Sequence, residues 1–450
     1  MPPLLGRRAA LALAINERFF YGRAMLALAA LIMFASGPGQ SHTFGVFLIP
    51  LAEELEISHT AISIAYAFAT LVAALGLPFV GKAVDRKGVR RVSILIVSAF
   101  GAATIAFSAV AGFVLLTLAF GLLRFLGQGS LMLCANNLAS QWFDKKRGIA
   151  LSLTMLGFSA SVALHPPIAQ WLMEAHGWRM AWIIMGIGTW LLLLPPVLWL
   201  LVDRPEELGL APDGPIGKPK DGDPIASKSE APATAKAMDE DRSAERGLDL
   251  AEARRTDAFW VILVSNSVYS TLATSIFFHQ VSIFQAKGLE PGLATSVFSI
   301  TALTMVVSSL ITGHLLDRLP TRPLYASALL STSLCLVMMS QVQGQLTAIA
   351  FAFVFGLSGG AMLAHVAYVW PRFFGRAYLG SILGTSQMGM VIGASLGPIP
   401  LGVGYDLLGG YDGSLLALAL LPIGCAVAVM SMRIPRIDES GPPPPSTPAT

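Results

Sequence analysis

The fold is decided by the stretch Gly81-Lys-Ala-Val-Asp85-Arg86-Lys-Gly88-Val-Arg90-Arg91, which returns later in the chain as Gly313-His-Leu-Leu-Asp317-Arg318-Leu-Pro-Thr-Arg322. The shared Gly, Asp and Arg residues lie 232 positions apart, from 313 − 81 = 232. Further residues match at this offset: Gly127 with Gly359, Gly157 with Gly389, and Pro166 with Pro398. Several matches at one offset indicate an internal duplication. We therefore expect two homologous halves.

The composition around these stretches excludes a soluble protein. Hydrophobic residues make up 54% of the 450 residues and charged residues 13%, whereas soluble domains carry about 25% charged residues. A chain with so little polar surface is not an ordinary cytosolic enzyme. With a net charge of only +3, it is not a nucleic-acid binder either. The sequence predicts a membrane protein that crosses the bilayer many times.

Apolar runs long enough to span a bilayer recur along the chain, six before and six after a polar insert. A spanning helix needs about 20 mostly apolar residues. We expect an all-α integral membrane fold with twelve transmembrane helices in two pseudo-symmetric six-helix bundles. The predicted spans are 24–50, 59–81, 92–111, 113–139, 148–171, 179–202, 259–284, 293–316, 324–343, 347–370, 379–408 and 414–433.

Five segments follow from this pattern. They are an N-terminal segment 1–23, a first bundle 24–202, a linker 203–257, a second bundle 258–433 and a tail 434–450. The linker is rich in proline and charge, and such a composition cannot bury a core; we expect linker and tail to be mostly disordered.

The basic residues predict the orientation. With twelve crossings, nearly all Lys and Arg fall on the side of the two termini, and only Arg179 and Lys287 fall opposite. The positive-inside rule therefore predicts cytoplasmic termini. We expect a multi-pass protein of the plasma membrane, most simply a monomer.

Together the repeated loop stretch, the 6+6 arrangement and the long central loop resemble the major facilitator superfamily. Trp142-Phe143-x-x-x-Arg147-Gly148 and Gly177-Trp178-Arg179 strengthen the resemblance. Arg204-Pro-Glu-Glu-Leu-Gly209 is similar to the monocarboxylate and oxalate–formate branch. The resemblance implies secondary transport by alternating access. It departs from the family in the second loop copy, which lacks the last glycine.

The loop stretch has two interpretations. One is simple anchoring by positive charge on the cytoplasmic side. The other, which the resemblance implies, is gating: contacts that join the halves when the outside is open. The gating candidates are Gly81, Asp85, Arg86, Arg90, Gly313, Asp317 and Arg318.

Arg124 is the one charge at mid-depth in a predicted span. Such a residue costs roughly 2.5–3.5 kcal/mol at the bilayer centre on insertion scales, so it must face protein or water. It either caps carbonyls or other polar groups between helices, or it binds an anionic substrate or tunes a proton site. Cavity-lining helices 1, 4, 7 and 10, which the resemblance implies, supply the other substrate-binding candidates. The substrate-binding candidates are therefore Arg124, Gln40, Asn266, Tyr269, His365 and Tyr368.

No Asp or Glu lies mid-span, so histidines are the groups that titrate near neutral pH there. The proton-coupling candidates are His365, His42, His279 and His165. A lone histidine is more often a hydrogen-bonded structural residue, and that interpretation stays open for each. The family often carries a basic residue in helix 8 or 11; this chain has none there, which disfavours a dicarboxylate.

We therefore expect a secondary transporter of a small organic solute, favouring a monocarboxylate anion moved with a proton. The alternatives are an exporter of drugs or metabolites from the same superfamily and, from another class, a non-transporting receptor or sensor. We expect no enzyme activity, no cofactor and no metal site. The expected partners are a small-molecule substrate, protons and the lipid bilayer, and not nucleic acid.

Overall fold

The computed structural model describes residues 12–17, 19–214, 247–375 and 379–435. Within these ranges the chain is helical and has no β-strand; an isolated bridge pairs Gly247 with Gly375. Parts of the predicted linker and tail, 215–246 and 436–450, lie outside the described residues.

The first predicted span is broken rather than continuous. Proline lacks a backbone N–H and glycine favours irregular backbone, and Gly37-Pro38-Gly39 places both in the middle of the apolar run. The run is divided into α2 (Gly22–Ala35), η1 (Gly37–Gly39), α3 (Ser41–Phe44), η2 (Gly45–Phe47) and α4 (Leu48–Leu55).

The other helices of the first half are long. Gly177 has φ 77° and ψ 161°, so it divides the 53-residue α9 into two spans. The fourth span runs through a π-helical turn, η3, between two α-helical parts. The elements are α5 (His59–Lys87), α6 (Val89–Phe107), α7 (Phe113–Leu123), η3 (Arg124–Leu131), α8 (Met132–Trp142) and α9 (Arg147–Trp199).

Two short helices, η4 (Pro205–Leu208) and α11 (Leu250–Ala253), lie between the halves in sequence. The second half repeats the pattern of long apolar helices. Its elements are α12 (Asp257–Ala286), α13 (Pro291–Leu316), α14 (Thr321–Ser340), α15 (Gln345–Phe374), α16 (Leu379–Leu396), α17 (Pro398–Leu408), α18 (Asp412–Leu418) and α19 (Leu420–Ser431).

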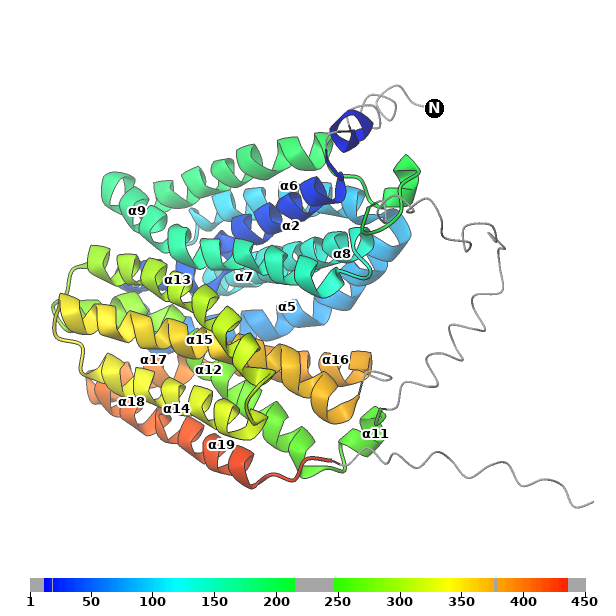
Figure 1. Cartoon of the computed structure of the whole chain (residues 1–450). Coiled ribbons are helices and arrows are strands. Elements are labelled where there is room, and N and C mark those ends of the chain that lie inside the picture. The colour runs from blue at the N-terminus through cyan, green and yellow to red at the C-terminus, as the bar shows by residue number, and fades with distance from the viewer. Residues whose placement is uncertain (1–11, 18, 215–246, 376–378, 436–450) are drawn as a thin grey trace, which may run out of the picture.

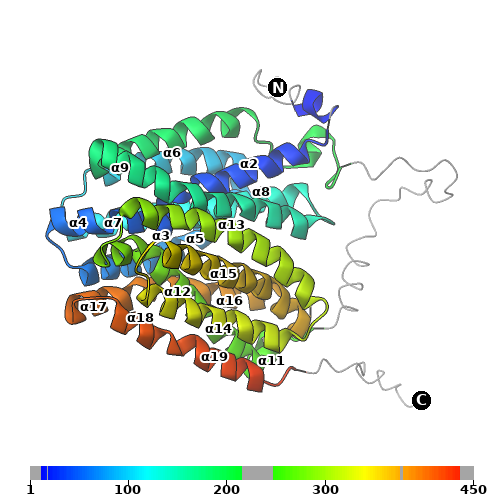
Figure 2. The same cartoon turned by 60° about the vertical axis from the view of Figure 1, so that its left-hand side comes forward.

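Ten helices of the described chain are long and apolar enough to cross a membrane. Because α9 holds two spans and the broken first run adds one, the described residues contain the twelve predicted crossings. Figures 1 and 2 show the two bundles side by side, blue to green for the first and green to red for the second. The predicted fold class is confirmed. Large apolar side chains such as Phe79 and Leu191 are exposed on the outside of the bundles, where lipid would cover them.

Candidate functional site

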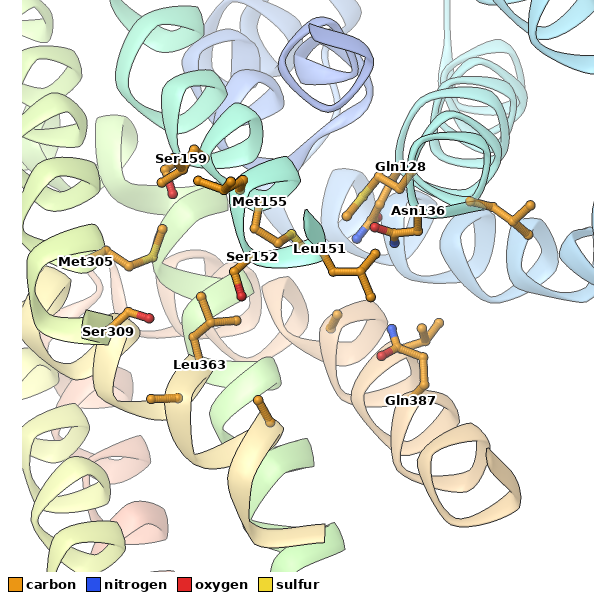
Figure 3. Close-up of a pocket in the computed structure, with 18 of the residues that line it drawn as sticks. Gln128, Asn136, Leu151, Ser152, Met155, Ser159, Met305, Ser309, Leu363 and Gln387 are labelled. Atoms are coloured by element: carbon orange, nitrogen blue, oxygen red, sulfur yellow. The ribbon is translucent and has the colours of Figure 1, made fainter. Parts of the chain in front are cut away.

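A cavity of about 1350 Å³ lies between the two halves. Its walls come from α5, η3, α8 and α9 of the first half and from α13, α15 and α16 of the second (Figure 3). It reaches Gly313 and His314, so it lies toward the end of the bundles that carries the repeated loop stretch. We call this the motif end, and the opposite one the far end. The polar wall residues are Thr70, Arg124, Gln128, Asn136, Asn137, Ser140, Arg147, Ser152, Ser159, Ser309, His314, Tyr368 and Gln387.

Arg124 is the deepest cation of this wall, and its side chain is 3% exposed. Its Nε donates to Thr70 Oγ1 at 3.2 Å and its Nη1 to the Gly39 carbonyl at 3.4 Å. Its guanidinium carbon lies 4.9 Å from the centre of the Tyr66 ring. No carboxylate of the described chain lies within ion-pair distance of it. The arginine therefore caps a carbonyl and also keeps an unneutralised charge at the cavity.

Five of the cavity residues of the fourth span are spaced by four: Arg124, Gln128, Met132, Asn136 and Ser140. The others, Gly129, Leu133 and Asn137, are their neighbours in sequence. In a regular α-helix a spacing of four drifts by about 40° per step. The π turn at the start of this stretch winds more slowly and offsets part of the drift, so all five side chains reach one cavity. Figure 3 shows Gln128 and Asn136 on this wall and Gln387 across the space. Of these, the site prediction contained only Arg124; the spacing of polar residues could have indicated the others.

The remaining substrate-binding candidates are divided between wall and core. Tyr368 lines the cavity. Gln40 is buried and donates to Ser36 Oγ at 3.1 Å, with Met132 Sδ at 3.5 Å. It is not among the wall residues in this conformation.

Asn266, Tyr269 and His365 lie inside the second bundle rather than on the cavity wall. Asn266 Oδ1 accepts a hydrogen bond from Tyr325 Oη at 2.7 Å, and the same tyrosine ring stacks on His365 at 5.1 Å. The phenol of Tyr269 lies against Gly359. Their role in substrate binding stays a prediction.

The other three proton-coupling candidates, His42, His165 and His279, also lie off the cavity wall. His42 Nε2 lies 3.2 Å from Ser161 Oγ, which lies 3.2 Å from His165 Nδ1. His279 Nε2 lies 2.9 Å from the Pro398 carbonyl oxygen, close to the far end.

The far end is closed by contacts between the halves. His59 Nδ1 lies 2.8 Å from Tyr411 Oη, and its ring stacks on Tyr405 at 4.2 Å. The backbone N–H of Thr60 donates to Asp406 Oδ2 at 2.8 Å. A Cβ on Gly402 would stand 2.6 Å from Ser63 Oγ, so α17 touches α5 directly.

Among the described residues of the motif end, the glycines and aspartates of the two loop copies are not packed against the opposite half in this conformation. A Cβ on Gly81 or Gly313 would meet no atom within 4 Å. Asp85 and Asp317 are exposed, as are the arginines that follow them, Arg86 and Arg318. The backbone N–H of Arg90 donates to Asp203 at 2.6 Å, and its guanidinium donates to the Leu198 carbonyl at 2.9 Å. Both contacts stay within the first half.

Near the cavity mouth, Asp213 fixes the segment after the sixth span. Its carboxylate accepts the backbone N–H groups of Lys145 at 2.7 Å and Lys146 at 3.1 Å. Burial raises the pKa of this carboxyl, but the three backbone N–H donors of residues 144–146 outweigh that effect and hold the pKa below its usual value. The segment that follows Arg204–Gly209 is thus held, through one carboxylate, against the turn that precedes α9.

Comparison with known proteins now decides the family. The Major Facilitator Superfamily model matches residues 26–398, with a second match over 276–449. The chain belongs to the Major Facilitator Superfamily. Monocarboxylate transporter 13 of Bos taurus is 25% identical over 414 residues, covering 90% of this chain and 88% of the relative. The oxalate:formate antiporter of Oxalobacter formigenes is 26% identical over 180 residues, 40% of this chain and 42% of the relative.

Solved structures of this superfamily share the fold. A bacterial homologue of the human lysosomal transporter Spinster, solved in an inward-facing and occupied conformation, superimposes with a TM-score of 0.64. The two are 13% identical, and the match covers 91% of this chain and 96% of the other. As a member of the superfamily, the present chain is a multi-pass integral membrane transporter and not an enzyme. The predictions of a transporter class and of a multi-pass membrane protein are thus confirmed.

Proposed function

We propose that this transporter carries a small organic monocarboxylate, together with a proton, by alternating access. The observation that supports this most directly is Arg124, a buried guanidinium at the cavity that no carboxylate of the described chain neutralises. Guanidinium groups bind carboxylates with two parallel hydrogen bonds. A substrate carboxylate is the missing counter-charge.

The charge of the cavity wall favours an anion. Among the described wall residues the ionised groups are Arg124, at depth, and Arg147, toward the mouth, and there is no Asp or Glu. A cleft lined by one sign of charge concentrates ligands of the other sign. The walls from α13 and α16 carry no Lys or Arg, so a second carboxylate would find no deep cation. The relatives named for monocarboxylates and for oxalate and formate agree with this class.

The two ends of the interface support alternating access. One end is open to the cavity, and the other is closed by His59, Thr60, Asp406 and Tyr411. With the orientation that the basic residues predict, the open side is cytoplasmic. We propose that substrate binds or leaves there in this conformation.

The test begins with a screen of small monocarboxylates for thermal stabilisation of the purified protein, followed by uptake of the best ligand into proteoliposomes. Substitution Arg124→Ala is expected to weaken binding roughly 100-fold, because removing one partner of a buried charge pair costs about 2–5 kcal/mol. Arg124→Lys keeps the charge but loses the planar fork and should recover only part of the affinity.

Arg433→Ala is the matched control, since Arg433 is an exposed arginine that follows α19 and is not among the cavity wall residues. Unchanged binding in Arg124→Ala would remove this residue from recognition and contradict the proposal.

An exporter of apolar metabolites is the second candidate. Met132, Met155 and Met305 lie on the cavity wall with several leucines, and methionine-rich surfaces adapt to varied apolar ligands. Stabilisation by uncharged amphiphiles and not by carboxylates, with no effect of Arg124→Ala, would favour this function.

A further inference from the structure

Two histidines of the first half are joined by one hydroxyl. His42 lies on the short helix α3, and Ser161 and His165 lie one turn apart on α9. Ser161 Oγ lies 3.2 Å from His42 Nε2 and 3.2 Å from His165 Nδ1. A hydroxyl donates one hydrogen bond and accepts others. It can therefore bridge a protonated and an unprotonated imidazole in either direction.

The break in the first span joins this pair to Arg124. The Gly39 carbonyl accepts the Nη1 hydrogen bond of Arg124 at 3.4 Å. Two residues earlier, a Cβ on Gly37 would stand 2.4 Å from the His165 ring, so only glycine lets that ring pack against the break. The three residues Gly37-Pro38-Gly39 thus touch the arginine at one end and the histidine at the other. If Arg124 moves toward a ligand, its hydrogen bond to the Gly39 carbonyl shifts the backbone of Gly37-Pro38-Gly39. The His165 ring packs against this same backbone.

The pair also lies where the halves meet. The His42 ring packs edge-on against Phe277 of α12, with centroids 6.2 Å apart, and against Phe158 at 6.0 Å. Near His165, Ser299 of α13 donates to the Ala163 carbonyl at 2.6 Å. Separation of the halves at the far end breaks these contacts. The pair is then reached from the side opposite to the present cavity opening.

Electrostatics link the pair to the anion site. The charged or titratable groups in reach of His42 are His165 and Arg124, both cationic when ionised. The neighbours from α12 and α13, Phe277 and Ser299, carry no charge. A proton on the pair is repelled by an unneutralised Arg124, and a bound anion removes that repulsion. Anion and proton then each favour binding of the other, and this coupling is reciprocal.

We propose that His42 and His165, bridged by Ser161, form the proton-binding pair that couples proton movement to the anion at Arg124. A proton enters on one imidazole. That imidazole then donates its N–H proton to Ser161 Oγ, while the hydroxyl gives its own proton to the other ring. One N–H bond breaks and one forms, and Ser161 exchanges one O–H bond for another, so the hydroxyl stays neutral and the two rings keep a single positive charge. The proposal rests on the proposed function and adds to it the residues that carry the proton.

The experiment compares two transport modes in proteoliposomes, using the monocarboxylate that the thermal screen identifies. Exchange of internal for external substrate needs no net proton movement, whereas accumulation driven by an imposed pH gradient does. Relative to exchange measured in the same variant, His42→Gln and His165→Gln should lose at least about tenfold of the driven accumulation, within the usual range of coupling between sites. Ser161→Ala, which keeps both rings, should slow driven accumulation in the same direction.

Proton uptake on substrate binding is the second measurement, made with a pH dye in weakly buffered detergent solution. Wild type should take up about one proton per anion bound, and His42→Gln should bind the anion without this uptake. His176→Gln is the control, because His176 is an exposed histidine of α9. Arg124→Ala should lose both signals.

The outcomes separate the two proposals. Anion binding and exchange with no proton uptake in the wild type overturn the histidine pair and leave monocarboxylate transport standing. Proton-driven accumulation that survives in the double variant H42Q/H165Q also overturns it. Failure of every monocarboxylate to bind overturns the proposed function, and the coupling falls with it.

Discussion

Each end of the interface carries an aspartate near the end of a helix and a glycine on a helix face, but within the described chain these residues contact the opposite half only at the far end. Asp85 lies two residues before the end of α5, and Asp406 lies two residues before the end of α17. Asp406 accepts the N–H of Thr60 at the start of α5, whereas Asp85 is exposed. Gly402 touches the opposite half, whereas Gly81 faces open space. The far end thus holds the halves together in this conformation, whereas Asp85 and Gly81 make no comparable contact; a gating role for the repeated loop stretch stays a prediction.

The largest effect is expected from filling the glycine at the closed end. Gly402→Val places a side chain against Ser63 and the His59 carbonyl, where a Cβ would already stand 2.6 and 2.9 Å away. Overpacking of this kind costs about 1–3 kcal/mol, which corresponds to a shift of roughly fivefold to 150-fold away from the closed far end. Spin labels at Glu56 and Leu408, both exposed, should move apart.

Gly81→Val is the matching substitution at the motif end, where a Cβ would meet no atom within 4 Å. It should leave the far-end label distance unchanged and slow transport. The three native cysteines are buried, so they leave the labels selective. Gly292→Val, at an open position of α13, is the control. An unchanged far-end distance in Gly402→Val would mean that the contact does not hold the halves together.

A smaller effect is expected from the two aspartates. Asp406→Asn weakens a charged contact with a helix N-terminus, and such contacts contribute about 0.3–1 kcal/mol. The far-end distance should broaden toward the open value. Asp85→Asn should instead slow transport several-fold and leave substrate affinity almost unchanged. Loss of affinity without loss of rate in Asp85→Asn would argue against a gating role.

The smallest effect concerns an ion pair within one half. Glu54 accepts hydrogen bonds from the Trp178 indole and from Arg179, whose Nη2 lies 2.7 Å from Glu54 Oε1. The Trp178 N–H, followed by Arg179, holds the pKa of Glu54 below its usual value. A lowered folded-state pKa gives stability that is present above the unfolded value of about 4.3 and is lost as pH falls through the folded value.

Thermal unfolding of the detergent-solubilised protein should therefore show a small loss of stability below about pH 4 that Glu54→Gln lacks. Both side chains are more than two-fifths exposed, so the contribution is no more than about 1 kcal/mol. Glu56→Gln is the control. Since both partners belong to the first half, the far-end label distance should not respond; a change there would place this pair in the gate.

Most of the fold was predictable because lipid leaves few choices. Apolar runs of about 20 residues must be helices in a bilayer, and the repeated stretch at Gly81 and Gly313 gave the two halves. The break at Gly37-Pro38-Gly39 was visible in the sequence, but its position inside an apolar run made a continuous helix the simpler prediction. The π turn has no such signal, since Arg124–Leu131 contains no proline and continues directly into the α-helical residues on either side.

The candidate site was predicted in part. Arg124 and Tyr368 were found because a charge or a phenol in lipid must face something polar. Asn266 and His365 also need partners inside the membrane, but they find theirs within the second bundle, where both contact Tyr325. Polarity in a span predicts a partner but not which partner. The open or closed state could not be predicted either, because the sequence holds the contacts of both conformations at once.

The loose winding of η3 has one more consequence. Arg124 is the first residue of that segment, and each residue added to or removed from a helical turn rotates what precedes it by about 100°. If this turn adopted α-helical geometry, the Arg124 side chain would point in a different direction, and the helix would stay continuous. The direction in which the protein points its anion anchor is thus tied to how tightly eight residues are coiled.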